Sequence, residues 1–270
     1  MRKEERQAQL LALIEQHETL TPQQLAQHLG ISIATIRRDL KQLANQGLLR
    51  RTRGRASLRA APSLYQRRLH SHSAEKRAIA KAACRFLQEG ASIYLDSGTT
   101  TLAVAHELQH VGTMNVVTND LHIAHALVGN PELIVQLCGG TVRRDTETLV
   151  GGAALEAIHA LRVEIAFMAA SAVNLTYGVS NIDPFEAEVK KEVLTRAQKK
   201  MLLVDSSKFG RTLASRWAPL EAFDWVITDP HLSPAVLQAL QQKDIRVVVA
   251  EMENDSLMEL VEKKDTIEYW

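Results

Sequence analysis

The stretch YLDSGTTT, residues 94–101, carries polar side chains that could hold a small anionic ligand. The apolar run before it predicts a strand, and the apolar pattern after it predicts a helix. At a helix amino terminus, free backbone N–H groups and the helix dipole favour an anion, and the hydroxyl groups of this stretch add donors. We therefore expect a phosphate site in the loop that leads into the helix. A Ser/Thr-rich helix cap without a ligand would use the same residues.

Seven apolar runs of four to eight residues alternate with helical patterns through the rest of the chain. Such runs are typical of strands buried on both faces, so we predict an α/β fold with an open, mostly parallel sheet. The runs are ASIYLD, MNVVTN, LIVQLC, VEIAFMAA, KMLLVD, DWVITD and IRVVVA, with TTLAVAHELQH, LHIAHALVG, PFEAEVKKEVLTRAQK and SPAVLQALQQ among the helices.

Polar residues gather where several of these strands end. Ligands of open parallel sheets bind at the carboxyl ends of strands. The loop is no Walker loop, because the Gly-Lys-Ser/Thr ending is missing, and no GxGxxG follows the first strand. The polar stretches are DSGTT, TND, CGGTVRR and DSSK.

The first sixty residues predict a different module. Thr21, Pro22 and Gln24 form a capping box at the start of one helix, which Gly30 ends. Ser32 caps a second helix, which Gly47 ends, and the two helices read as a helix-turn-helix. Two short strands about Gly54 would add a basic wing. We expect Ile33, Ile36, Leu40 and Leu43 on the buried face of the second helix and Asp39 to hold a cation or the fold.

The polar face of that second helix is suited to the major groove of double-stranded DNA. Its first residues are small, and its arginines could bind guanine bidentately. A helical protein-interaction module with a basic surface is the alternative interpretation. Aromatic stacking residues are absent from residues 1–60, which argues against RNA or single-stranded DNA. The expected DNA contacts are Ser32, Ala34, Thr35, Arg37, Arg38 and Lys41 on the helix, and Arg51, Arg53 and Arg55 on the wing.

The charge of the 270-residue chain is unevenly distributed. Residues 1–60 hold 11 basic and 5 acidic residues, whereas the remainder holds 21 basic and 26 acidic residues. A basic unit of this kind suggests nucleic acid as the partner. No apolar run is long enough to cross a bilayer, and we expect a cytoplasmic protein. The expected domains are residues 1–58 for DNA binding, a linker over 59–74, and an α/β domain over 75–270.

The quoted motifs resemble the DeoR family of bacterial sugar-metabolism regulators over nearly the whole chain. IRRDLKQLANQGLLRRTRG resembles the family's winged helix, and LDSGTTT, VVTND, CGG, EAEVKKEVLTRA and LLVDSSKFG resemble its C-terminal domain, which is similar to ribose-5-phosphate isomerase. The resemblance implies that a phosphorylated sugar binds there. It places the phosphate on Ser97, Gly98, Thr99 and Thr100, the sugar on Asp96, Asn119, Asp120, Gly139 and Gly140, and Lys190 and Lys208 near the same pocket.

Three features depart from the family's pattern. The wing has one glycine and an arginine where the family has a glycine pair, and Glu164 and the MAAS stretch at 168–171 replace the family's Asp and glycine. We expect both of the latter at the strand end that faces the ligand. Arg143 and Arg144 could reach the phosphate or be surface charges, and Lys190 could instead belong to an ion-paired helix face with the neighbouring glutamates.

Three functions fit these observations. The first is a repressor whose DNA affinity a phosphorylated sugar lowers, acting as a homodimer or homotetramer on a repeated site. The second is a sugar-phosphate isomerase with a DNA-binding head, for which Asp96 or Glu164 would be the base, although an acid-rich loop like the isomerase's is missing. The third is an architectural DNA binder with a vestigial pocket.

We expect no cofactor, no metal at His106, His110, His122 and His125, and core or interface positions for Trp217, Trp225 and Trp270.

Overall fold

The computed structural model describes residues 6–7, 9–10, 13–14, 21–45, 49–52, 55–58, 65, 68–69, 71–108, 111–243 and 245–252. It divides into two compact units, residues 1–67 and residues 68–270, which are described separately. The division falls within the range 59–74 given above for the linker, whose limits stay a prediction. The expectations for Gly47, Arg53, Gly54, His110 and Trp270 lie outside the described residues.

The first unit contains the predicted helix-turn-helix. Helix α2 (Pro22–Leu29) begins at Thr21, whose side chain accepts from Gln24 N while the Gln24 side chain bonds back to Thr21, so the capping box is confirmed. Gly30 ends the helix in the left-handed conformation, with a φ of 64°. Helix α3 (Ile33–Asn45) follows after a turn, and Ser32 Oγ accepts the Thr35 N–H at 3.2 Å.

One face of α3 packs into the core of this unit. Ile36, Leu40 and Leu43 are buried there against α2 and the helical residues 10 and 14, but Ile33 is 40% exposed. The expectation for Ile33 was wrong: it lies on the same face as Leu40, seven residues later, but as the first residue of α3 it is at the end of that face and stays exposed. Strand β1 (Leu49–Thr52) pairs antiparallel with β2 (Arg55–Leu58), which confirms the two strands of the wing.

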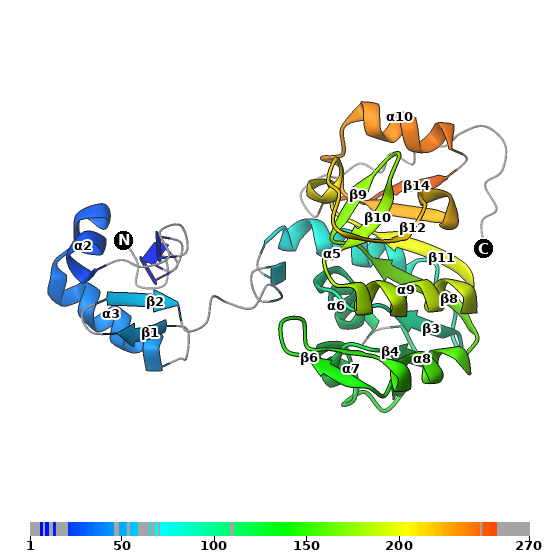
Figure 1. Ribbon diagram of the computed structural model, residues 1–270, viewed down its shortest axis with the longest axis horizontal. Coiled ribbons are helices and arrows are strands. Elements are labelled where there is room, and N and C mark those ends of the chain that lie inside the picture. The colour runs from blue at the N-terminus through cyan, green and yellow to red at the C-terminus, as the bar shows by residue number, and fades with distance from the viewer. Residues whose placement is uncertain are drawn as a thin grey trace. The chain divides into compact units, whose positions relative to one another are not determined.

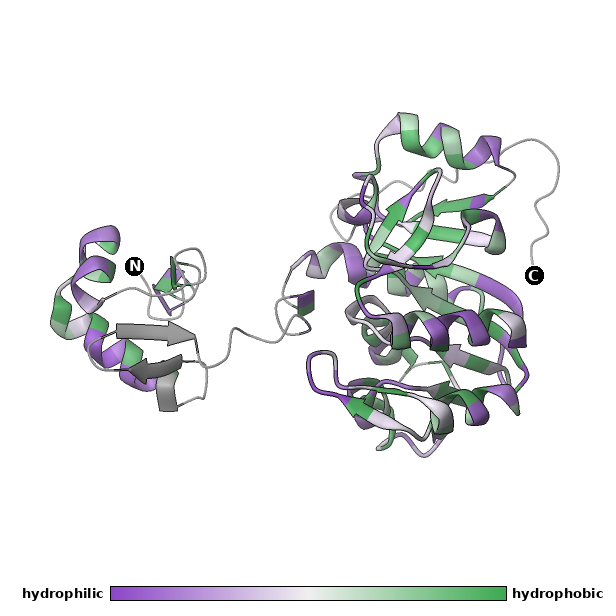
Figure 2. Ribbon diagram, viewed as in Figure 1, coloured by the Kyte–Doolittle hydropathy of each residue, from purple (hydrophilic) through white to green (hydrophobic). Residues whose placement is uncertain are grey.

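The second unit is built on a seven-stranded sheet in which all neighbouring strands are parallel (Figure 1). All seven predicted strands are present, and their hydrophobic residues form the green interior that polar helix faces enclose in Figure 2. In spatial order they are β14 (Arg246–Val249), β13 (Trp225–Thr228), β11 (Ala197–Leu203), β8 (Val163–Ala169), β3 (Ser92–Leu95), β4 (Met114–Thr118) and β5 (Leu133–Leu137).

Helices cover both faces of this sheet (Figure 1). Because parallel crossovers are right-handed, the connections from β3 to β5 and those from β5 to β14, which run across the sheet in opposite directions, place their helices on opposite faces. The first connections contain α6 (Thr99–Glu107) and α7 (Leu121–Leu127), and α5 (Ser73–Cys84), which precedes β3, packs beside α6. The second connections contain α8 (Gly152–His159), α9 (Pro184–Arg196) and α10 (Pro234–Gln242).

Short elements complete the second unit. A hairpin of β6 (Thr141–Arg143) and β7 (Thr148–Val150) follows β5, and a three-stranded sheet contains β12 (Ser215–Ala218), β10 (Gly178–Asn181) and β9 (Ala172–Asn174). Single-turn 3-10 helices occur at Ser206–Lys208 and Leu220–Ala222. The predicted helix PFEAEVKKEVLTRAQK is shorter than expected, because Ala197 already pairs with Val163 as the start of β11.

Of the two tryptophans that the structure describes, Trp217 is in the core as expected and Trp225 is half-buried. Trp217 is buried and meets the Phe223 ring edge-on, while Trp225 packs against Phe86 and the Arg246 guanidinium. These contacts anchor the small sheet and the β13–β14 edge to the helices beside them.

Candidate functional site

The carboxyl ends of β3 and β8 lie side by side at the centre of the sheet, where the chain reverses the direction in which it adds strands. This is the switch point at which open α/β sheets form a crevice. The loops after β3, β4, β5, β8 and β11 all open toward the same edge. The structure therefore brings the predicted polar stretches to one edge of the sheet, and the chemistry of that edge depends on what each loop presents.

The amino terminus of α6 presents donors for an anion. Its N-cap is Gly98, and no side chain caps the helix there. The N–H groups of a first helical turn have no acceptor within their own helix, so those that begin at Thr99 can serve a ligand. Thr99 and Thr100 are nearly buried beside them, and the Thr101 hydroxyl donates to Gly98 O at 2.9 Å. Ser97 is half-buried at the front of the loop.

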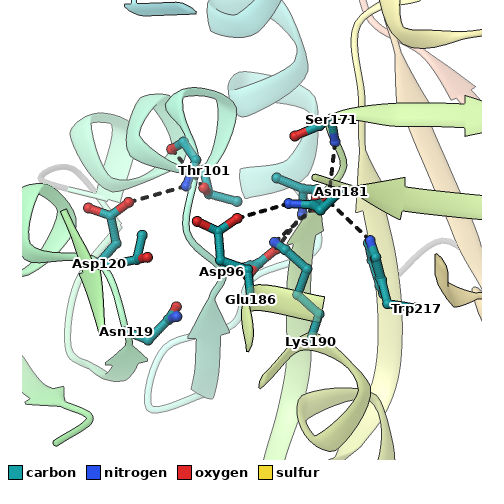
Figure 3. Close-up of polar contacts among 12 residues, drawn as sticks. Asp96, Thr101, Asn119, Asp120, Ser171, Asn181, Glu186, Lys190 and Trp217 are labelled. Atoms are coloured by element: carbon teal, nitrogen blue, oxygen red, sulfur yellow. Dashed lines mark hydrogen bonds and ion pairs between the residues drawn. The ribbon is translucent and has the colours of Figure 1, made fainter. Parts of the chain in front are cut away.

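Asp120 connects the starts of two helices. Its Oδ1 accepts the His122 and Ile123 N–H groups at 2.8 and 3.2 Å and so caps α7. Its Oδ2 accepts the Gly98 N–H at 3.2 Å, and Figure 3 shows Asp120 bonded to the loop beside Thr101. Burial raises the pKa of this carboxyl to about 6, against the effect of these N–H donors. A negative charge at Asp120 would repel an anion bound at α6, so the two compete for the same positive end of the helix.

A buried ion pair crosses from β3 to α9. Lys190 Nζ bonds to Asp96 Oδ2 and donates to Ala169 O at 3.1 Å, and the two charged side chains are 1% and 0% exposed. The Ala169 N–H donates to Asp96 Oδ2 at 2.8 Å. Burial raises the pKa of Asp96, and the Lys190 ammonium opposes that rise. The pair ties the end of β8 to the start of the α6 loop.

A second buried carboxylate, Glu186, was not among the predicted site residues. It accepts from Thr146 Oγ1 at 2.7 Å and from Asn181 Nδ2 at 3.1 Å, and Asn181 Oδ1 accepts from Trp217 Nε1 at 3.2 Å (Figure 3). The interpretation of α9 as an ion-paired outer face was wrong for Glu186 and Lys190, which point inward. Their spacing of four residues, in step with buried Val193, could have revealed an inward face.

Two of the predicted ligand residues hold the backbone of β7 in place, Asn119 by a hydrogen bond and Gly140 by close packing. Asn119 accepts from Tyr94 OH at 2.9 Å and donates to Leu149 O at 3.1 Å, which fixes β7 beside the site. A side chain at Gly140, with a φ of 125°, would place its Cβ 2.5 Å from Val150 O. The exposed Gly139 faces Ala153 at the start of α8. The N-cap of α8 is Gly151, so this helix, like α6, has no side-chain cap.

The remaining charged candidates are spread around the edge. Arg143 is half-buried in an ion pair with Asp183 at 2.5 Å, and Arg144 is exposed. Lys208 follows β11, with its Nζ 3.8 Å from Asp205 Oδ2. The expectation for Glu164 was wrong: it is the second residue of β8 and accepts the Ser92 N–H, so it lies at the opposite, amino end of the sheet. The MAAS stretch is at the carboxyl end of β8 as expected, because Met168 and Ala169 are the last residues of the strand and Ala170 and Ser171 follow it.

The first unit presents the predicted DNA face. Ser32, Ala34, Arg37, Arg38 and Lys41 are exposed, while Thr35 is half-buried with its hydroxyl 2.9 Å from Ser32 Oγ. Asp39 is buried and pairs with Arg6 at 2.6 Å, so it holds the fold, as one of the two expectations for it stated. Strands β1 and β2 carry Arg51 and Arg55 on the wing.

No group of three His, Cys, Asp or Glu residues within the described part of the chain could hold a metal ion. His106 and His125 are exposed, and His122 pairs with Glu147 at 3.2 Å. Within those same residues, no helix has the length and apolar character required to cross a membrane.

Comparison with known proteins decides the family. Residues 71–230 match the family described as the DeoR C-terminal sensor domain, and residues 6–60 match the DeoR-like helix-turn-helix domain. The chain belongs to the DeoR family of DNA-binding transcriptional regulators. It is 34% identical to an HTH-type transcriptional regulator of Haemophilus influenzae over 84% of this chain and 90% of the relative. It is 29% identical to the glycerol-3-phosphate regulon repressor of Escherichia coli, over 92% and 99%.

Among solved structures, ribose 5-phosphate isomerase A of Methanocaldococcus jannaschii matches with a TM-score of 0.38 and 20% identity. The match covers 52% of this chain and 55% of the isomerase. The expected likeness to the isomerase is thus present, but a likeness of this size carries no argument about function.

Proposed function

We propose that this DeoR-family regulator represses a carbohydrate-utilisation operon and is released from its operator by a phosphorylated sugar. The observation that carries the ligand half is the amino terminus of α6, which begins at uncapped Gly98 at the switch point of the parallel sheet. Its N–H groups and the Thr99 and Thr100 hydroxyls suit a phosphate. The repressor relative named for glycerol-3-phosphate supports the same ligand class.

The ligand set that we propose combines anion donors with sugar contacts. Ser97, Gly98, Thr99 and Thr100 hold the phosphate. The other members are at neighbouring strand ends or in the loops after them and bind or position the sugar: Asp96, Asn119, Asp120, Gly139, Gly140, Lys190 and Lys208. Because Asp96, Asn119 and Lys190 already bond within the protein, we assign them the role of holding the loops in place.

The operator half rests on the exposed face of α3 and on the wing. Arg37 and Arg38 would read bases or phosphates in the major groove, and the wing arginines would meet phosphates or the minor groove. One helix-turn-helix unit contacts few base pairs, so we propose that a homodimer or homotetramer binds a repeated sequence in the operator DNA. Operator DNA and phosphorylated sugars are both found in the cytoplasm, where we place the protein.

Isomerase activity is the alternative from a different class, and we propose that the chain is not an enzyme. A general base must reach the substrate proton, but the carboxylate of Asp96 is paired with Lys190 and fully buried. Glu164, the other candidate base, is at the opposite end of the sheet. Turnover of ribose 5-phosphate or fructose 6-phosphate by the purified protein would contradict this part of the proposal.

A thermal-shift experiment tests the ligand half. Ribose 5-phosphate, fructose 6-phosphate, glucose 6-phosphate and glycerol 3-phosphate are compared with ribose, fructose, glucose and glycerol. We expect one phosphorylated compound to raise the melting temperature while its free form does not, and Thr99→Ala to remove the effect. The control Thr176→Ala alters an exposed turn residue after β9 and should keep it. A vestigial pocket, as in an architectural DNA binder, predicts no shift with any compound.

A further inference from the structure

The sensor unit begins with a short segment, residues 68–69 and 71–76, which we call the junction segment. The first of these residues, Arg68, follows the last residue of the DNA-binding unit in the chain. Any signal that passes along the chain between the units must therefore pass through this segment. Its contacts are consequently informative about how the two functions could be coupled.

A buried lysine fastens the segment to itself. Lys76, in the first turns of α5, is 4% exposed, and its ammonium bonds to the carbonyl oxygens of Arg68 and Ser71. The Ser71 hydroxyl adds a bond to Arg68 O at 3.3 Å. His72, between them, adopts a φ of 53°, which residues other than glycine seldom do. The segment is thus folded into one specific turn around a cation.

This arrangement has an energetic cost. A buried ammonium is unfavourable unless it is well compensated, and burial lowers the pKa of Lys76 to about 8 although Asp205 opposes the change. An apolar side chain of similar length would avoid that cost but would not bond the carbonyl oxygens of Arg68 and Ser71. The lysine therefore joins these two carbonyls and sets the conformation of the segment.

The segment also contacts the ends of three neighbouring strands of the ligand-binding edge. Arg68 Nη1 donates to Ser171 Oγ at 3.4 Å, two residues beyond the end of β8. The charge of Asp205, which follows β11, raises the pKa of Lys76 against the effect of burial, although the two side chains form no ion pair. Glu75 Oε1 is 4.0 Å from His231 Nδ1, just after β13.

The contact at β8 is adjacent to the proposed phosphate site. Ala169, two residues before Ser171, bonds to both members of the Asp96–Lys190 pair. A Cβ at Gly98 would lie 3.1 Å from the Ala169 Cβ, so the anion loop and the end of β8 pack directly together. A ligand seated on the loop thus has a short path to Ser171.

From these contacts we propose that the junction segment is the output element of the sensor, with Arg68 reading ligand occupancy at the end of β8 and Lys76 holding the segment in the conformation that is read. The identity of the ligand, a phosphorylated sugar, rests on the proposed function. The coupling of the junction segment to DNA binding can be tested without that ligand. Because binding couplings are reciprocal, DNA bound by the first unit should perturb the same segment.

The first test is hydrogen exchange of the full-length protein with and without DNA from upstream of its own gene. We expect changed exchange in peptides covering residues 71–84 and unchanged exchange in α10, the internal control. Unchanged exchange in residues 71–84 on saturation with DNA would overturn the inference, whatever the sugar phosphates do.

The second test compares DNA affinity by fluorescence anisotropy with and without the phosphorylated compounds named above. If the wild-type affinity falls, by about 5- to 150-fold for an ordinary allosteric coupling, Arg68→Gln, Ser171→Ala and Lys76→Met should each reduce that change. The thermal shift with the compound should persist, because the anion loop is intact. Arg162→Gln and Lys191→Met, at exposed positions of the same unit, are the matched controls.

The two possible failures are distinguishable. A wild-type protein that binds DNA but responds to no compound contradicts the proposed function, while the exchange result still decides the inference. Variants that respond to the compound as strongly as the wild type does would overturn the inference and leave the proposed function standing.

Discussion

At the scale of single residues, the ion pair between Asp96 and Lys190 places two opposite charges where almost no water reaches. The Trp217 ring lies over the lysine, with its centroid 5.5 Å from Nζ. Neither charged group can be removed alone without leaving its partner uncompensated. The pair thus explains how a ligand edge made of separate loops keeps one arrangement.

Removal of the lysine should be costly. We predict that Lys190→Met lowers the free energy of unfolding by about 3–5 kcal/mol, because the Asp96 carboxylate stays buried without its cation. The neighbouring Lys191→Met, at an exposed position on the same helix, should change it by less than about 0.5 kcal/mol. Urea unfolding measures both. Equal stability of the two variants would mean that the pair is not structurally required.

Asp120 should make stability depend on pH in the acidic range. Burial raises its pKa from an ordinary value of 3.8 to about 6 in the folded protein, so the folded state favours the protonated form. The corresponding stabilisation is fully present below about pH 4 and is lost as the pH rises through 6, a change of about 3 kcal/mol in total.

Asp120→Asn should remove this dependence, since an amide does not titrate. Chemical unfolding at pH 4.5 and 7.5 should show that the wild type loses more stability than the variant over this interval. Asp145→Asn, at an exposed position, is the control and should behave as the wild type does. A loss of stability in Asp120→Asn as large as that of the wild type would contradict the assignment.

At the scale of elements, close packing of the loop after β5 against β7 explains why a glycine is required there. A side chain at Gly140 would overlap the Val150 carbonyl, and the backbone is in a region that glycine adopts readily. We predict that Gly140→Ala costs about 1–3 kcal/mol of stability and weakens binding of the phosphorylated sugar. Thermal unfolding and the thermal-shift panel measure the two effects.

Gly129 is the matched glycine for this comparison. It lies beyond the end of α7, and an added Cβ would meet no atom within 4 Å. Gly129→Ala should leave stability unchanged or raise it by up to about 1 kcal/mol. If both variants unfold alike, the contact between the β5 loop and β7 does not constrain the site.

Helix α3 gives a prediction for the DNA-binding element. Arg38 is exposed on the proposed groove face and resides in a helix whose opposite face is packed. Arg38→Gln should weaken binding to the operator by about 1–3 kcal/mol if the guanidinium contacts a base, with a loss of sequence preference. A uniform loss with a lower salt dependence would instead indicate a phosphate contact, and no loss would contradict the assignment of this face.

The sequence predicted some elements well because their signals are local. The seven strands are continuous apolar runs, and the Thr21–Gln24 box lies within one turn of its helix. The strands β9, β10 and β12 are only three or four residues long, with mixed polarity, and gave no such signal. Helix α8 begins at the second of two consecutive glycines, a pair that resembles a loop in the sequence.

The site was less predictable because its bonds join distant residues. Asp96 and Lys190 are 94 positions apart, and nothing in either neighbourhood identifies the other as its partner. Glu164 was misplaced because an apolar run indicates a strand without showing which of its polar neighbours lies at the ligand edge. The role of Ser97 to Thr100 in holding a phosphate stays a prediction.

At the scale of the whole molecule, two units with different chemistry share one chain. The first exposes arginines on a helix-turn-helix, and the second gathers an uncapped helix start and buried charges at one sheet edge. A regulator needs the free energies of the two binding events to be coupled, and about 1–3 kcal/mol is enough. The junction segment is the part of the chain through which we expect that coupling to pass.

The most direct test of this account is a fluorescence-anisotropy titration of the full-length protein on DNA from upstream of its own gene, at fixed salt. Each phosphorylated sugar and its free sugar are added in turn. The account predicts that one phosphorylated compound weakens DNA binding, that its free sugar does not, and that Thr99→Ala binds DNA normally but ignores the compound. Tight DNA binding that every phosphorylated compound leaves unchanged would contradict the claim that the α6 site controls the DNA-binding unit.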